Sequence, residues 1–121
     1  LSPVKVRQLL KAKANVKRAE AMFHYETFSR LEPVTAGEAE AVSNLLVPVQ
    51  KHPLMIANGR THPVRVDWQM EPGEFAPMAE VRPMSAMLLW SPAPSAWRVR
   101  QGRRVLGDFV SGRKPDQILF A

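Results

Sequence analysis

The chain has 121 residues, of which 45% are hydrophobic and 23% are charged. This length and composition predict one globular domain and exclude a disordered polyelectrolyte. Seventeen Lys and Arg against 11 Asp and Glu give a net charge of +6, which favours anionic partners such as nucleic acid. The absence of cysteine excludes disulfides, thiolate metal ligands and thiol nucleophiles. No apolar run approaches the roughly 20 residues that a membrane-spanning helix needs, so we expect at most peripheral association with a membrane complex.

Residues 1–18 contain six basic side chains and no acidic one. A basic, acid-free start is typical of organellar presequences, but serine is scarce here and Lys outnumbers Arg. We therefore interpret the segment as part of a mature protein from which a presequence was removed upstream. The prediction that follows is a mitochondrial location, with the cytoplasm as the alternative.

The first predicted element is a long helix over residues 3–31. Ser2 and Pro3 suit the cap and the first position of a helix, and neither Gly nor Pro follows until Pro33. Apolar side chains recur every seven residues at Leu9, Val16 and Phe23. A seam with so few large side chains indicates a helix that packs on its own domain or on a neighbour rather than a free coiled coil.

A second helix is predicted over residues 36–47. Thr35 and Glu38 have the spacing of a capping box, and the turns that follow place Ala39 and Val42 on one face together with Leu45 and Leu46. Pro48 ends the helix because the residue before a proline avoids the helical conformation. Joined by residues 32–34, the two helices would form a helical hairpin.

Residues 48–94 form the third region and contain eight of the eleven prolines. Asn58-Gly59 is typical of a type I′ turn, so we expect a β-hairpin between residues 54–57 and 60–68. No periodicity is visible from Gln69 to Ser85, and a long segment of this kind is usually functional or follows a surface. The sequence predicts that it gains order only when a partner binds.

Short strands are predicted over residues 95–121. Trp97 to Arg100 alternate into Gln101-Gly102, which would place Arg98 and Arg100 on the face opposite Trp97 and Val99. The fold class predicted for the chain is therefore a single α+β domain over residues 1–121. It would consist of an N-terminal helical hairpin, a long Pro-rich extended segment and a small antiparallel sheet.

Catalytic and metal-binding patterns are missing from the sequence. The three histidines His24, His52 and His62 do not have metal-ligand spacing, and the glycines form neither a phosphate-binding loop nor a nucleophile elbow. We therefore expect no enzyme, no metal and no cofactor.

The basic clusters are the candidate binding residues. Arginines that flank a tight turn can bind phosphates or carboxylates through guanidinium forks, and a Lys-rich helix can add a second contact. The predicted nucleic-acid-binding residues are Arg98, Arg100, Arg103, Arg104, Arg113, Lys114, Lys5, Arg7, Lys11, Lys13, Lys17 and Arg18.

These features predict a non-catalytic structural subunit of a large assembly that binds RNA and neighbouring proteins through its basic ends. A ribosome-like ribonucleoprotein is the first expectation. The alternatives are an accessory subunit of a membrane-bound energy-converting complex, such as a respiratory or ATP synthase complex, and a small DNA-binding regulator.

Overall fold

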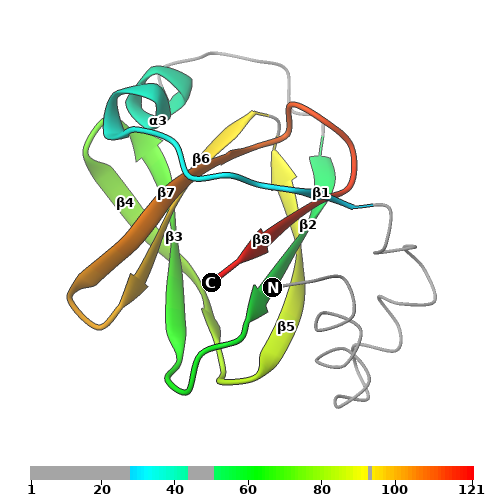
Figure 1. Cartoon of the computed structure of the whole chain (residues 1–121). Helices are drawn as coiled ribbons and strands as arrows, with labels where there is room; N and C mark the ends of the chain where they lie inside the picture. Colours follow the sequence, from blue (N-terminus) through cyan, green and yellow to red (C-terminus); the bar gives the residue numbers. More distant parts are fainter. Residues whose placement is uncertain (1–27, 44–50, 93) are drawn as a thin grey trace.

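The computed structural model describes residues 28–43, 51–92 and 94–121, which form two four-stranded β-sheets and one short helix (Figure 1). Sheet A has the order β1 (Ser29–Arg30), β8 (Gln117–Phe120), β2 (Lys51–Asn58) and β5 (Ser85–Pro92). Sheet B has the order β4 (Glu74–Val81), β3 (Val64–Glu71), β6 (Ser95–Gln101) and β7 (Arg104–Ser111). The predicted α+β fold is therefore wrong, because the described residues are mostly strand.

The two sheets are connected differently. In sheet B every pair of neighbouring strands is antiparallel, and β3–β4 and β6–β7 are hairpins. In sheet A, β2 and β5 are antiparallel, whereas β8 runs parallel to both β1 and β2. The chain passes from sheet A to sheet B between β2 and β3 and back between β4 and β5, so each sheet is built from distant parts of the sequence.

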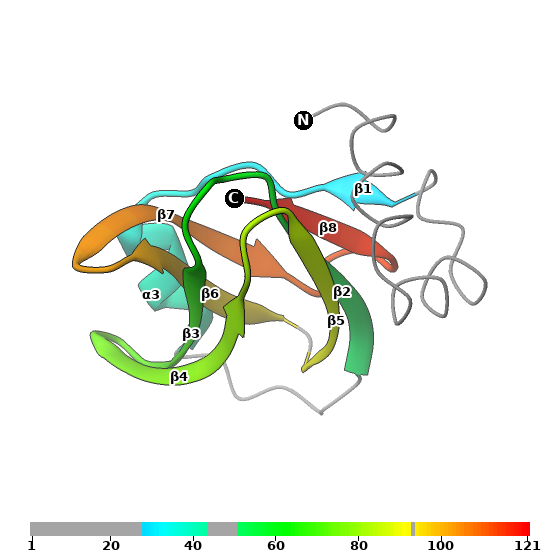
Figure 2. The same ribbon diagram turned by 90° about the horizontal axis from the view of Figure 1, so that it is seen from below.

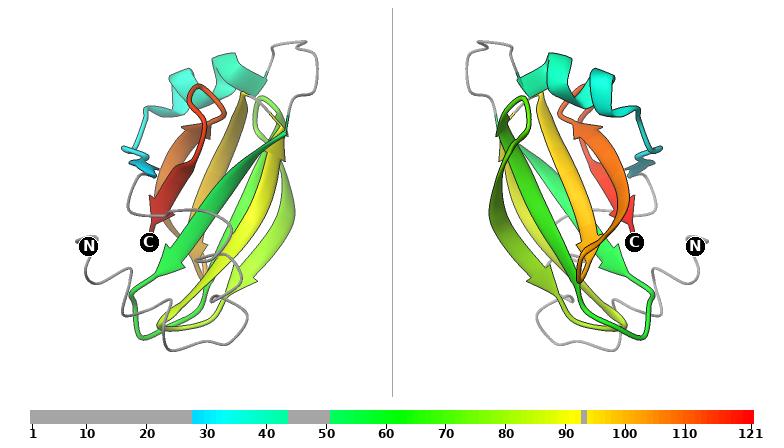
Figure 3. Two further views of the ribbon diagram at one scale, coloured as in Figure 1. Left: turned by 90° about the vertical axis from the view of Figure 1, so that its right-hand side faces the viewer. Right: turned by 90° about the vertical axis from the view of Figure 1, so that its left-hand side faces the viewer.

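The main core lies between the sheets and follows from strand alternation. Leu54 and Ile56 of β2 point inward, as do Val64 and Val66 of β3, while the residues between them point outward. Trp97 of β6 is the largest fully buried side chain. Figures 2 and 3 show the two sheets as layers that enclose this core.

The helix α3 (Ala36–Ser43) covers one end of sheet B (Figure 3). Its predicted start is confirmed, since the Glu38 amide donates to the Thr35 hydroxyl at 3.2 Å. Ala39 and Val42 are buried against Ala96 and Val110 of the sheet, as their spacing predicts. The predicted continuation over residues 44–47 lies outside the described residues.

The predicted first helix can be compared only at its end, because residues 1–27 lie outside the described residues. Ser29–Arg30 is a strand that pairs with β8, so the prediction of helix up to residue 31 is wrong there. Leu31 is buried in the core between the sheets, and it needs the extended backbone to reach that position from the edge of sheet A.

The predicted hairpin around Asn58-Gly59 is also wrong. The strand β2 pairs with β5 and β8, and β3 pairs with β4 and β6. The pattern misleads because the Asn58 side chain is completely buried and holds a crossover between the sheets instead of a two-residue turn.

The expectation of an unstructured segment from Gln69 to Ser85 fails because prolines occupy positions that strands tolerate. Pro72 lies in the β3–β4 turn and Pro83 in the β4–β5 turn. Pro77 lies within β4 beside a shift in the register with β3, and β4 has one hydrogen-bonded neighbour in sheet B. Edge strands and bulges are the places where a missing amide donor costs least.

Candidate anion-binding surface

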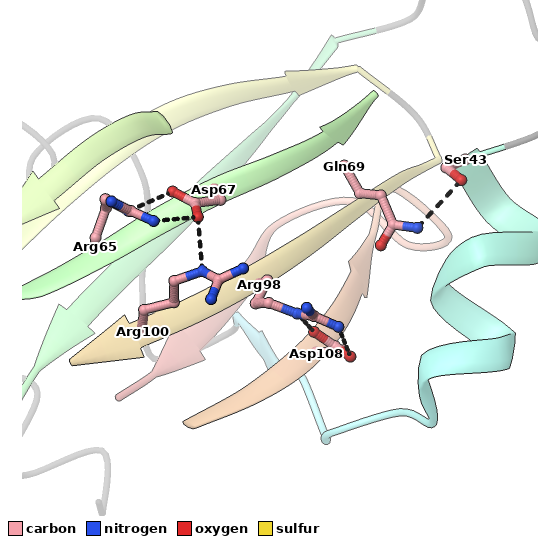
Figure 4. A network of polar contacts seen from close by, with 7 residues as sticks. All are labelled: Ser43, Arg65, Asp67, Gln69, Arg98, Arg100 and Asp108. Carbon is pink, nitrogen blue, oxygen red and sulfur yellow. Dashed lines mark hydrogen bonds and ion pairs between the residues drawn. The ribbon is translucent and has the colours of Figure 1, made fainter. Parts of the chain in front are cut away.

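The outer face of sheet B carries charged side chains that the β-register brings together. On β3, Arg65 and Asp67 point away from the core, and on β6 Arg98 and Arg100 do the same, as their alternation with Trp97 and Val99 predicts. Arg65 lies opposite Arg100, and Asp67 lies opposite Arg98. Figure 4 shows these side chains together with Asp108 of β7.

Asp67 binds two of these arginines. The Nε atom of Arg100 lies 2.9 Å from Asp67 Oδ2 and donates to it, and Nε of Arg65 lies 2.8 Å from Oδ1. The Asp67 side chain is 2% exposed, compared with 21% for Arg100 and 50% for Arg65. A carboxylate this deeply buried requires cationic partners, so Arg100 is committed to the fold.

Arg98 is held in the same way by Asp108. Its Nε and one terminal nitrogen donate to the two carboxylate oxygens at 2.8 and 3.2 Å, a bidentate geometry. These hydrogen bonds raise the pKa of Arg98 above its ordinary value, against the opposing effect of burial. The guanidinium also lies 4.3 Å from the centroid of the Phe75 ring, within cation–π distance.

Arg98 and Arg100, two of the predicted nucleic-acid contacts, therefore have carboxylate partners within the chain. Their carboxylates come from β3 and β7, so these ion pairs join three strands of sheet B. At the helix end of the same face, the Gln69 amide donates to the Ser43 hydroxyl at 3.4 Å. The outer face of sheet B is thus a largely satisfied polar layer.

A second group of cations lies on three loops at the end of the molecule away from α3 (Figures 1 and 3). The buried Asn58 side chain joins two of these loops, because its amide nitrogen lies 2.9 Å from the His62 carbonyl and 3.2 Å from the Arg82 carbonyl. The Arg60 amide donates back to Asn58 Oδ1 at 2.9 Å. Arg60 contacts the third loop, the β6–β7 turn. One of its terminal nitrogens donates to Oε1 of Gln101, the last residue of β6, at 3.4 Å.

We call this group the basic loop end, and all of its members are exposed: Arg60, His62, Arg82, Arg103 and Arg104. Residues 58–63, 82–84 and 101–104 contain no Asp or Glu. The ion pairs found among the described residues involve Arg65, Arg98 and Arg100, so these exposed arginines have no carboxylate within ion-pair distance in that part of the chain. The arginines on the outer face of sheet B are therefore paired with carboxylates, whereas those of the basic loop end have no such partner among the described residues.

Charge is distributed unequally between the two ends of the molecule. The end that carries α3 also carries the β3–β4 turn, with exposed Glu71 and Glu74. The predicted contacts Arg113 and Lys114 are exposed on the β7–β8 loop at this same end. The structure thus separates them from Arg103 and Arg104, which belong to the same set of predicted nucleic-acid contacts.

No protein-family model matches this chain, and no curated protein sequence is significantly similar to it. Among the described residues, no three His, Asp or Glu side chains lie close enough to hold a metal ion. In the same part of the chain, no helix is long and apolar enough to cross a bilayer.

The predicted nucleic-acid contacts include two of the five members of the basic loop end, Arg103 and Arg104, and miss the other three. Arg103 and Arg104 stand out because they are adjacent to a turn. Arg60 and Arg82 are isolated in sequence, so no local pattern marks them. The six predicted N-terminal contacts, Lys5, Arg7, Lys11, Lys13, Lys17 and Arg18, lie outside the described residues.

Proposed function

We propose that the protein is a non-catalytic subunit of a ribonucleoprotein assembly and that the basic loop end binds the phosphate backbone of RNA. The observation that carries the proposal is that four exposed arginines lie on or directly beside three linked loops that contain no Asp or Glu. Arginine on protein surfaces is commonly balanced by nearby acids, as Arg98 and Arg100 are here. Guanidinium groups on neighbouring loops that lack a carboxylate partner favour an external anion.

The loops that carry these arginines are anchored, which supports a binding role. The hydrogen bonds of Asn58 fix the β2–β3 and β4–β5 loops to one another, and Gly102 adopts the positive φ of 60° that a tight β6–β7 turn needs. Cations on rigid turns lose little conformational entropy when they bind, so more of the electrostatic attraction contributes to affinity.

The chemistry favours contact with the backbone over recognition of bases. The three loops contain no Phe, Tyr or Trp, and His62 is the one aromatic ring in them on which an unpaired base could stack. Phosphate contacts position a protein on nucleic acid without reading sequence. We therefore expect affinity that depends strongly on salt and weakly on base composition.

The test compares two variants that each remove two positive charges. Arg103→Gln with Arg104→Gln alters the basic loop end, whereas Arg113→Gln with Lys114→Gln alters exposed cations at the opposite end. Each phosphate contact contributes a slope of about 0.7 to 0.9 in log K against log salt. We expect the first pair to lower the slope for single-stranded RNA by about 1.5 and the second pair to leave it near the wild-type value.

Binding is measured by fluorescence anisotropy with RNA of mixed sequence at salt concentrations from about 50 to 200 mM. Duplex DNA of equal length forms a second arm, and preferential binding to it would support the DNA-binding alternative instead. An equal decrease of the slope in both variants would show that RNA binding depends on the net charge of the protein and not on a particular site. Wild-type slopes in both, with poor recovery of the Arg103/Arg104 variant in its native complex, would identify a protein partner and overturn the proposal.

Arg98 and Arg100 are unsuitable for this test. Their removal would leave Asp108 and Asp67 with fewer cationic partners in a buried layer. A loss of binding in those variants could then arise from a damaged sheet rather than from a missing phosphate contact.

A further inference from the structure

The Asn58-Gly59 step is chemically the most labile amide position in the sequence. The backbone nitrogen that follows an asparagine can attack the side-chain amide carbon and close a five-membered ring. Glycine favours this attack because it has no side chain to obstruct the ring and because its backbone is conformationally free. Of the three asparagines in the chain, Asn58 alone precedes a glycine, whereas Asn15 and Asn44 precede larger apolar residues.

In the folded protein the amide of Asn58 is fully engaged. Its nitrogen donates to the carbonyl oxygens of His62, Val81 and Arg82 at 2.9, 3.0 and 3.2 Å. Its oxygen accepts from the Arg60 amide at 2.9 Å. Rotation of the side chain toward the following nitrogen would break these hydrogen bonds, and each buried polar group left without a partner raises the free energy. The native contacts therefore oppose the first step of ring closure.

The attacking nitrogen is held as well. The Gly59 N–H donates to the Ala121 carbonyl oxygen at 3.4 Å, and the Ala121 amide donates to the Ala57 carbonyl oxygen at 2.9 Å. These two bonds continue the parallel pairing of β8 with β2 beyond Phe120. The end of β2 must therefore separate from the end of β8 before the Gly59 nitrogen is released.

We propose that Asn58 is a latent deamidation site, which the native fold protects and which opening of the β2–β3 loop exposes. The Gly59 nitrogen loses its proton to solvent and forms a bond to Asn58 Cγ. The Cγ–Nδ2 bond breaks, and the nitrogen leaves as ammonia after taking up a proton. Water then opens the cyclic imide to aspartate or isoaspartate, so water is the one co-reactant. The proposal goes beyond the RNA-binding function and does not depend on it.

The product cannot restore the link between the loops. A carboxylate has no N–H to donate to the three carbonyl oxygens that surround the Asn58 amide. A negative charge that faces acceptors in a buried position is strongly unfavourable. Isoaspartate also lengthens the backbone at the end of β2. One deamidation event would therefore convert reversible opening of this region into irreversible loss of the native loop structure.

The test measures deamidation in the full-length protein at mildly alkaline pH, with and without urea, by proteolysis and mass spectrometry. We expect Asn58 to react at least about tenfold more slowly in the folded protein than in urea, because reaction requires local opening. In urea it should react faster than Asn15 and Asn44, which are internal controls in the same chain. Gly59→Ala should slow the reaction at Asn58 in urea severalfold.

Two results would overturn the proposal. Equal rates at Asn58 in the folded protein and in urea would show that the hydrogen bonds give no protection. A rate at Asn58 in urea no higher than at the other two asparagines would show that the Asn58-Gly59 step is not unusually labile.

The consequence of the reaction is tested with Asn58→Asp, which introduces the carboxylate of the product directly. Asn58→Ala is the matched control, since it removes the same N–H donors without adding a charge. The urea midpoint of Asn58→Asp should lie below that of Asn58→Ala, and failure of Asn58→Asp to fold beside a folded Asn58→Ala would be the same result. A midpoint for Asn58→Asp at or above that of Asn58→Ala would show that the fold accommodates the product and would overturn this part of the proposal.

Discussion

Replacing Asp67 by Asn should destabilise the protein, because it removes the charge that holds two arginines on sheet B. The carboxylate is 2% exposed and accepts a hydrogen bond from Arg100, whose side chain is 21% exposed. A hydrogen bond to a charged group contributes about 1.5 to 3 kcal/mol. The pair with Arg65 is half exposed and contributes less than about 1 kcal/mol.

Asn keeps the volume of Asp and one carbonyl acceptor, so part of this stabilisation is retained. We therefore expect Asp67→Asn to lower the free energy of unfolding by about 2 kcal/mol, and Asp67→Ala by about 3 kcal/mol. For a chain of this size, a loss of 2 kcal/mol lowers the urea midpoint by about 1 M at an unchanged m-value. It should lower Tm by roughly 8 °C.

Glu80→Gln is the matched control. Glu80 lies opposite Arg65 on β4 but is exposed, so its substitution should change the free energy of unfolding by less than about 0.5 kcal/mol. The effect at Asp67 should persist at high salt, since buried pairs are weakly screened. An Asp67→Asn protein within about 0.5 kcal/mol of wild type would refute the view that this carboxylate stabilises the sheet.

Four other substitutions test the loops, the core and α3. Asn58→Ala should lower the free energy of unfolding by about 2 to 3 kcal/mol, because the Asn58 side chain joins two arginine-bearing loops. It should also weaken RNA binding in the anisotropy assay without a change of charge. Unchanged RNA affinity would show that the loops need no anchor. Ser111→Ala removes the hydroxyl that accepts a hydrogen bond from the buried Trp97 indole N–H at 2.7 Å. It should lower the free energy of unfolding by about 1 to 3 kcal/mol, measured by urea unfolding followed by fluorescence. An unchanged free energy of unfolding would mean that another group accepts the indole hydrogen bond. Gly102→Ala should lower the free energy of unfolding by about 1 kcal/mol in thermal unfolding, because the φ of Gly102 is 60°. Gly37→Ala in α3 should raise it by about 0.5 kcal/mol, because an added Cβ meets nothing within 4 Å there. Changes of the same sign in both variants would contradict the turn geometry.

Local patterns predicted the elements whose partners are near in sequence. The β6–β7 hairpin, with Trp97 and Val99 facing inward, follows from alternation around a turn. The start of α3 follows from the Thr35 cap. Each of these depends on interactions within a few residues, which sequence patterns record directly.

The overall fold could not be predicted because it depends on distant pairings. The strand β2 pairs with β5 and β8 instead of with β3, and no local signal encodes that choice. The density of prolines suggested an extended arm, although Pro77 lies at a register shift in an edge strand where the missing amide matters little.

The same limitation applies to the candidate site. Arg100 and Asp67 are 33 residues apart, so the sequence could not show that this arginine is neutralised. Arg60 and Gln101 are 41 residues apart, and their contact brings one uncompensated cation to the turn that carries two others. Which arginines are free for a partner is decided by tertiary pairing.

The position of β8 has a consequence for the order in which the chain folds. This strand, Gln117–Phe120, lies between β1 and β2 and is parallel to both. Sheet A therefore remains divided on the ribosome until residues 117–120 have left the exit tunnel, whereas the strands of sheet B are all synthesised by residue 111. Long-range parallel pairing of this kind is slow, and nascent chains would expose the apolar strands β2 and β5 in the meantime. Sheet B should gain protection first in pulsed hydrogen exchange, and the closure of sheet A should limit the rate of folding.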